Sequence, residues 1–207
     1  MAALPATSQP TVDAIYAGYE ADQESGYRYH LGASLIGTEC DRSLWYSFRW
    51  ATRVQFAGRM LRLFQTGHLE EARFVAELRR AGVTVYDSDP ETGKQIGVRD
   101  DGGHFGGSLD GALLGVKEAP ATWHVGEFKT HNAKSFAKLA KEGVQKSKPR
   151  HYAQMQVYMH LTGMARAFYL ARNKDTDELY SERIQYDVDY AIRLVARANR
   201  IINAPRP

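Results

Sequence analysis

The sequence predicts a mixed α/β fold in which helices pack on a sheet, and two changes of pattern carry this prediction. Between residues 59 and 81, apolar side chains recur at spacings of three and four, which is the period of an amphipathic helix. From residue 83 onward, apolar and polar residues alternate, and turn residues separate the alternating segments, as expected of strands. Helices then return after residue 132, so helical segments stand before and after the strands.

Each element follows from its local pattern. Helices are expected over 12–21, 41–50, 59–81, 133–142, 149–161 and 188–202. Gly82 ends the third of these, because glycine adopts the left-handed conformation that commonly terminates a helix. Strands are expected over 83–87, 94–99, 104–116, 122–130, 165–173 and 179–184. No shift of composition marks a second domain.

Composition excludes several classes of protein. The chain has 207 residues, a formal net charge of +3 and 43% hydrophobic residues, which is typical of a globular protein. No apolar run approaches the ~18 residues of a membrane span, and the N-terminus lacks the features of a secretory signal. Cys40 is the single cysteine, which excludes an internal disulfide and an all-cysteine metal site within this chain. We therefore expect a reducing, cytoplasmic setting and no membrane association.

Two basic segments indicate a polyanionic partner. Residues 129–151 contain seven lysines and arginines and one acid, and residues 42–62 contain five arginines and no acid. Lysines or arginines that meet phosphates release condensed counterions, which favours binding to nucleic acid. Lys134, Lys138 and Lys141 share one face of the expected helix and are candidate nucleic-acid contacts. The alternative is a solvated helix face, and charge alone leaves both interpretations open.

Two acids and a lysine stand in otherwise apolar strands. Glu127 and Lys129 are two residues apart, so their side chains leave the strand on the same face, and Asp110 lies on the preceding expected strand. Such groups are costly to bury unless they are paired or bind a metal. Carboxylate oxygens suit Mg²⁺ or Mn²⁺, and a lysine beside the metal can stabilise developing negative charge. A structural ion pair, or charges on an exposed edge strand, is the alternative.

Asp110-x₁₆-Glu127-x-Lys129 resembles the signature of the PD-(D/E)XK nuclease superfamily, with Leu109 where proline is usual. The segment from Gln154 to Tyr158 is similar to the Q-x-x-x-Y motif of RecB-like and phage lambda-type exonucleases, and the segment from Gly67 to Glu71 is similar to their G-x-x-x-(E/H) element. The resemblance covers about residues 60–175. It implies a restriction-endonuclease-like αβββαβ core with a central mixed sheet flanked by helices.

The resemblance also implies roles for individual residues. Asp110, Glu127 and Lys129 would be catalytic. The carboxylates would hold Mg²⁺ or Mn²⁺ together with the Phe128 carbonyl and Glu71. Within a single nuclease domain spanning 1–207, it implies an N-terminal helical region (1–57), a catalytic core (58–185) and a C-terminal helix (186–207).

Further residues are candidates for contacts with DNA. By resemblance, Gln154 and Tyr158 would face the site, although Tyr158 fits a core position nearly as well. Arg28 and Ser34 resemble residues that contact a terminal phosphate. His68 is a candidate metal or phosphate contact, with a neutral packed histidine as the more usual alternative. Glu70 is expected to point to solvent.

The resemblance extends to cofactors and partners. Cys40 resembles the first cluster cysteine of an iron–sulphur branch of these nucleases, but that branch needs three further cysteines, so we expect no cluster. DNA is the expected substrate and a single-strand annealing protein the expected companion. Lambda-type relatives form rings, which leaves a homo-oligomer open.

The function implied is a metal-dependent DNA exonuclease that leaves 5′-phosphate products in phage-type recombination or replication. Three alternatives stay open at this point. The first is a structure- or site-specific endonuclease of the same fold. The second is a nucleic-acid-binding protein with an inactive nuclease core, and the third is an unrelated α/β protein whose strands carry structural ion pairs.

Overall fold

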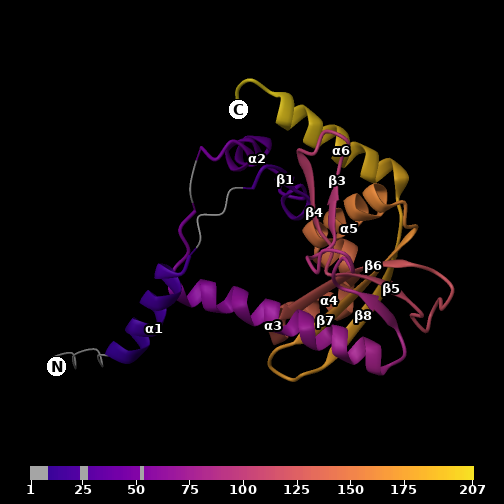
Figure 1. The fold of residues 1–207 in the computed structure, drawn as a ribbon, viewed down its shortest axis with the longest axis horizontal. Helices are drawn as coiled ribbons and strands as arrows, with labels where there is room; N and C mark the ends of the chain where they lie inside the picture. Colours follow the sequence, from indigo (N-terminus) through magenta and orange to yellow (C-terminus); the bar gives the residue numbers. More distant parts are fainter. Residues whose placement is uncertain (1–8, 24–27, 52–53) are drawn as a thin grey trace.

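The computed structural model describes residues 9–23, 28–51 and 54–207 and contains two sheets flanked by helices (Figure 1). The helices are α1 (Pro10–Ala21), α2 (Asp41–Phe48), α3 (Gly58–Arg80), α4 (Ala133–Ser147), α5 (Pro149–Thr162) and α6 (Val188–Asn203), with a 3₁₀ turn η1 (Ala33–Leu35). The strands are β1 (Leu31–Gly32), β2 (Thr84–Tyr86), β3 (Gly97–Arg99), β4 (Phe105–Ser108), β5 (Gly111–Leu114), β6 (His124–His131), β7 (Arg166–Asn173) and β8 (Leu179–Gln185).

The main sheet has the strand order β2-β5-β6-β7-β8. Strands β6 and β7 are parallel, and the other neighbours in this sheet are antiparallel. A parallel pair needs a long crossover, which α4 and α5 supply. Read as α3, β2, β5, β6, α5 and β7, the chain follows the expected αβββαβ order. The mixed α/β fold class predicted from the sequence is confirmed.

Helices cover both faces of the main sheet because its strands alternate their side chains between two cores. On one face, Phe74 and Leu78 of α3 pack with Phe128 of β6. On the other face, Met155 of α5 packs with Val125 of β6. The central strand β6 is therefore buried between α3 and α5, and any polar side chain on it lies in a largely apolar surrounding.

One strand prediction is wrong in a way that matters for function. Residues 104–116 do not form one strand but two, which belong to different sheets: β4 pairs with β1 and β3, whereas β5 pairs with β2 and β6. The break falls at Leu109 and Asp110. Helix α5 packs directly on β4 at Gly107, where any side chain would collide with the Tyr158 hydroxyl. Asp110 consequently lies between strands and not within a hairpin.

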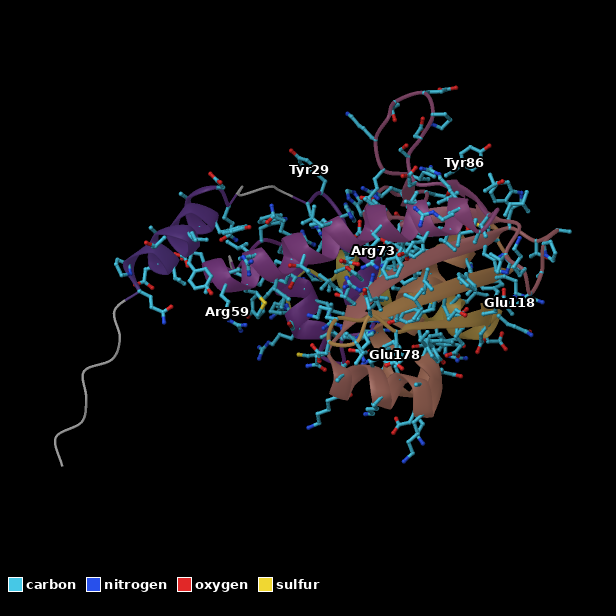
Figure 2. All side chains as sticks on the ribbon, turned by 90° about the horizontal axis from the view of Figure 1, so that it is seen from below. Tyr29, Arg59, Arg73, Tyr86, Glu118 and Glu178 are labelled. Carbon is cyan, nitrogen blue, oxygen red and sulfur yellow. The ribbon has the colours of Figure 1, made fainter. Side chains whose placement is uncertain are left out.

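The N-terminal region, expected to be helical, also contributes strand β1, which pairs in parallel with β4. Helix α1 and the first half of α3 project from the sheets (Figure 1). They pack closely: Glu20 Oε1 accepts a hydrogen bond from the Gly58 backbone at 2.6 Å. In Figure 2, Arg59 lies on the projecting half of α3 and Arg73 on the half over the main sheet.

Helix α2 is fixed to the end of α6 by charge. Arg197 Nη2 lies 2.6 Å from Asp41 Oδ1, and Arg200 Nη2 lies 2.9 Å from Asp41 Oδ2. Cys40 directly precedes this contact and is exposed. Among the helices of the described residues, none has both the length and the apolar character needed to cross a bilayer.

Candidate active site

The candidate site lies where strand β5 stops and β6 continues. In the antiparallel ladder, Gly111 at the start of β5 pairs with Gly126, so β6 runs on from Glu127 to His131 beyond its neighbour. The two strands approach closely at Gly126, where a Cβ would come within 3.1 Å of the Gly111 carbonyl oxygen. Asp110 lies beside this unpaired edge of β6, and its Oδ2 accepts a hydrogen bond from the Phe128 backbone at 2.7 Å.

Asp110, Glu127 and Lys129 are brought together at this edge. Lys129 Nζ lies 2.6 Å from Glu127 Oε1 and 3.4 Å from Asp110 Oδ2. The same ammonium donates a hydrogen bond to the Phe128 carbonyl at 2.9 Å. The convergence anticipated from the two-residue spacing is thus present, although Asp110 reaches it from a loop.

Burial strongly affects the ionisation of Glu127 and Lys129. The Glu127 side chain is fully buried, and desolvation raises its pKa to about 7 despite the attraction of Lys129, with the Asp110 charge adding to the rise. Glu127 Oε2 has no hydrogen-bond partner among the described residues. For Lys129, burial acts to lower the pKa, but the Asp110 and Glu127 carboxylates outweigh it, so the net shift is upward.

Glu71 of α3 lies near enough to Asp110 and Lys129 to feel their charges. It lines a cavity of about 470 Å³ together with Phe128 and Lys129. Burial raises the pKa of Glu71, and the charge of Asp110 raises it further. His68 lines the same cavity with its Nδ1 3.6 Å from Glu71 Oε1, and its side chain is 76% exposed, so the packed-histidine interpretation is wrong.

The donor set suits a hard divalent cation. Asp110, Glu127 and Glu71 supply carboxylate oxygens and Phe128 a carbonyl oxygen, the ligand types that Mg²⁺ and Mn²⁺ prefer. A buried carboxylate oxygen without a hydrogen bond, such as Glu127 Oε2, is costly unless a cation compensates it. Across the described ranges, no three His, Cys, Asp or Glu side chains are grouped closely enough to hold a metal by themselves. Lys129 now acts as the counter-cation of the carboxylates.

Gln154 and Tyr158 are buried on α5. Burial raises the pKa of Tyr158, and the charges of Glu127 and Asp110 raise it further, while a hydrogen bond with Gln154 acts in the opposite direction. The Tyr158 ring also belongs to the main core cluster. The core position expected as the alternative for Tyr158 is therefore observed, and its role toward the site stays a prediction.

Arg28 and Ser34 stand near each other at the cavity. Arg28 lines it, and a Cβ on Gly32 would lie 3.2 Å from Arg28 Nη1 and 3.5 Å from Ser34 Oγ. Arg150 Nη2 reaches the Ser34 carbonyl at 3.5 Å. Of the basic stretch 42–62, Arg53 lies outside the described residues.

The α4 lysines are in a different place. Lys134, Lys138 and Lys141 are exposed along α4, and none lines the cavity beside Glu71. Lys138 forms an ion pair of 3.9 Å with Glu142. The structure therefore does not bring this lysine face to the acidic pair.

Sequence reasoning missed or misplaced two residues near the site. Lys174 lines the cavity directly after β7. The parallel pairing of β6 and β7 predicts its position, since parallel strands end at the same edge of a sheet. Glu70 does not point freely to solvent, because its side chain pairs with Arg172 of β7 and lies 3.8 Å from Arg73.

The fold of the chain has counterparts among solved structures. No protein family and no curated protein matches the chain by sequence. Its structure matches the alkaline exonuclease LHK-Exo from Laribacter hongkongensis, with a TM-score of 0.57, 19% identity and coverage of 92% of this chain and 90% of the other. The chain has an exonuclease fold. LHK-Exo has also been solved in complex with dAMP, and that structure matches with a TM-score of 0.60.

A phage-related exonuclease from Haemophilus somnus 129PT has the same fold. It aligns with a TM-score of 0.58 and 13% identity over 84% of this chain and 92% of the other. The restriction-endonuclease-like exonuclease fold implied by the motifs is thereby confirmed.

Proposed function

We propose that this protein is a Mg²⁺- or Mn²⁺-dependent DNA exonuclease that hydrolyses phosphodiester bonds and leaves 5′-phosphate products. The observation that carries the proposal is the cluster of Asp110, Glu127 and Lys129 on the open edge of β6, next to a cavity lined by Arg28. The fold shared with two exonucleases supports it.

The residues of the chain have distinct tasks in this reaction. Asp110, Glu127, the Phe128 carbonyl and Glu71 would hold the divalent ion. Such an ion supplies a lowered pKa of bound water and offsets charge on the phosphodiester. Lys129 would orient the attacking water and stabilise the negative charge that develops on phosphate oxygens.

The cations at the cavity favour a terminal phosphate. Arg28 provides a guanidinium, the side chain best suited to bidentate phosphate contacts, and Ser34 provides a hydroxyl beside it. Lys174 adds a second cation to the lining of the cavity. LHK-Exo binds dAMP, a mononucleotide, and a terminal nucleotide of this kind fits the product of an exonuclease.

Gln154 and Tyr158 hold the DNA strand or the ligand carboxylates from the α5 side. These contacts read no base edges, as a sequence-tolerant nuclease requires.

We further propose that residues 1–207 act as one nuclease domain on DNA in the cytoplasm of a bacterial or phage-infected cell. A single-strand annealing protein and further copies of this chain are the proposed partners in phage-type recombination.

The test uses linear and closed-circular duplex DNA with Mg²⁺, with and without a chelator. We expect release of mononucleotides from linear DNA only, and none with the chelator. Cutting of circles would favour the endonuclease of the same fold. Binding without cutting would indicate an inactive core, and neither binding nor cutting would leave the acidic pair as a structural ion pair.

A further inference from the structure

A cluster of three rings, two of them buried and one partly buried, extends the functional face of β6 beyond Lys129. Glu127, Lys129 and His131 alternate along β6 and so share one face. Tyr169 of β7, which pairs with Glu127 in the parallel ladder, is fully buried. Its hydroxyl lies 2.9 Å from His131 Nε2 and 2.9 Å from His151 Nδ1 of α5. None of these rings has a role in the proposed chemistry.

The hydroxyl of Tyr169 has one proton, so it donates to one imidazole and accepts an N–H from the other. The three rings are nearly parallel, with interplanar angles of 24° and 26°. Burial, followed by nearby lysines, lowers the pKa of His131 to about 4. Burial, followed by Lys129, lowers the pKa of His151 to about 3. The network is therefore complete with both histidines neutral.

The network reaches a fourth element on its other side. Ser135 Oγ, in the first turn of α4, lies 3.2 Å from His131 Nδ1 and accepts a hydrogen bond from Lys148 Nζ at 2.6 Å. The contacts thus join β6, β7, α4 and α5 at the end of β6 that carries Lys129. His151 lies three residues before Gln154, about one turn of α5 away.

We propose that Tyr169, held between His131 and His151, is a positioning residue for the active site. The bond to His151 fixes the first turn of α5 on the sheet, and this sets the distance of the following turn, with Gln154, from the carboxylates. The bond to His131 fixes the strand end just beyond Lys129. Together the two bonds keep the Lys129 ammonium directed at the Asp110 and Glu127 carboxylates. This role rests on the proposed function only for its effect on cleavage.

Two substitutions that remove one side of the network test the role. Tyr169→Phe removes only the bridging hydroxyl, and His151→Leu removes one partner. We expect each to lower kcat at least tenfold, with KM for DNA unchanged within twofold. In His151→Asn the side-chain amide stands near the position of Nδ1, and in His131→Gln it stands near Nε2. We expect both conservative variants to keep most of the wild-type kcat.

The chain offers a matched control on the same helix. His160 Nδ1 lies 2.6 Å from the Tyr186 hydroxyl at the far end of α5. Tyr186→Phe therefore removes a similar bond from the same helix, away from Lys129. We expect its kcat to stay within twofold of wild type even where its melting temperature falls as much as that of Tyr169→Phe. Equal losses of kcat in the two variants, or no loss in Tyr169→Phe, would overturn the proposal.

A second readout does not depend on cleavage. The rate of reductive methylation of Lys129 by formaldehyde and a borane reductant is followed by mass spectrometry of metal-free protein. A lysine held between carboxylates reacts slowly, so Tyr169→Phe should increase this rate several-fold and Tyr186→Phe should not. Equal rates in both variants would contradict the proposal. If wild type cleaves no DNA, the proposed function fails, and the methylation rates alone decide the positioning role.

Discussion

The backbone N–H of Phe128 donates a hydrogen bond of 2.7 Å to Asp110 Oδ2, at the place where β6 has extended beyond β5. This bond ties a loop carboxylate to an open strand edge one residue from Glu127. It leaves the second Asp110 oxygen free of this contact and keeps the Phe128 carbonyl, which accepts from Lys129, on the same rim. A paired β5 strand in place of Asp110 would cover this edge.

Removal of the charged groups should separate chemistry from binding. Asp110→Ala should abolish cleavage while DNA binding survives or improves, because the substitution removes metal and local negative charge together. Lys129→Ala should lower kcat ~10²-fold or more, as expected when a group that stabilises the transition state is removed, with metal binding retained. Single-turnover cleavage and a filter-binding assay check both, and wild-type turnover by either variant would refute the assignment.

Glu127→Gln should stabilise the metal-free protein. Burial raises the pKa of Glu127 from its ordinary 4.5 to about 7, so ionisation of this carboxyl opposes folding. The native state binds the extra proton between these values, and stability is lost as pH rises through 7. The variant should therefore gain more at pH 8 than at pH 5, with an upper limit of about 3 kcal/mol at 1.36 kcal/mol per pKa unit. Chemical denaturation at both pH values measures this. An equal gain at both would contradict it.

The histidine pair should weaken the fold in acid. His131 and His151 have native pKa values of about 4 and about 3, below the ordinary 6.5, so the unfolded state binds more protons below pH 6.5. Stability should fall with pH from 6.5 toward 4, by up to about 1.4 kcal/mol per pH unit for each histidine. Denaturation is best measured in the Glu127→Gln background, which removes the opposing trend. Adding His131→Gln should flatten the slope by up to half. An unchanged slope would mean that His131 titrates normally.

The α4 lysines keep their predicted contact with DNA as a hypothesis. Changing Lys134, Lys138 and Lys141 to Gln should reduce the slope of log K against log salt by roughly 0.7 to 0.9 for each phosphate that is no longer neutralised. Cleavage at saturating DNA should stay near normal because the carboxylates are untouched. Lys174→Gln is the control at the cavity. If only that variant changes the slope, the α4 face is solvated and the DNA follows the cavity side.

Much of the fold followed from local periodicity. The alternation from residue 122 to 130 anticipated β6, and the spacing between Glu127 and Lys129 placed both on one face, because a strand repeats every two residues. The long apolar pattern ending at Gly82 anticipated α3, which closes at Arg80. Such segments are determined by their own residues.

The sequence predictions that the structure contradicts depended on contacts between distant segments. The break at Asp110 arises because β4 joins a second sheet with β1 and α5 presses Tyr158 against Gly107. Nothing in residues 104–116 alone reveals that division. The pairing of Glu70 with Arg172 likewise joins α3 to β7, and such a contact is invisible to periodicity. His131, a polar residue at a strand end, gave no signal of its buried network.

Calorimetric titration of Mn²⁺ into the protein, with DNA present, tests the central claim most directly, namely that the carboxylates on the open edge of β6 hold a divalent ion. Wild type, Asp110→Ala and the surface variant Glu118→Gln, which removes an exposed carboxylate elsewhere, are compared at pH 8, where Glu127 is mostly ionised. We predict a saturable binding curve for wild type and Glu118→Gln, and its loss in Asp110→Ala. Indistinguishable curves for wild type and Asp110→Ala would contradict the account and leave Asp110, Glu127 and Lys129 as a structural ion cluster.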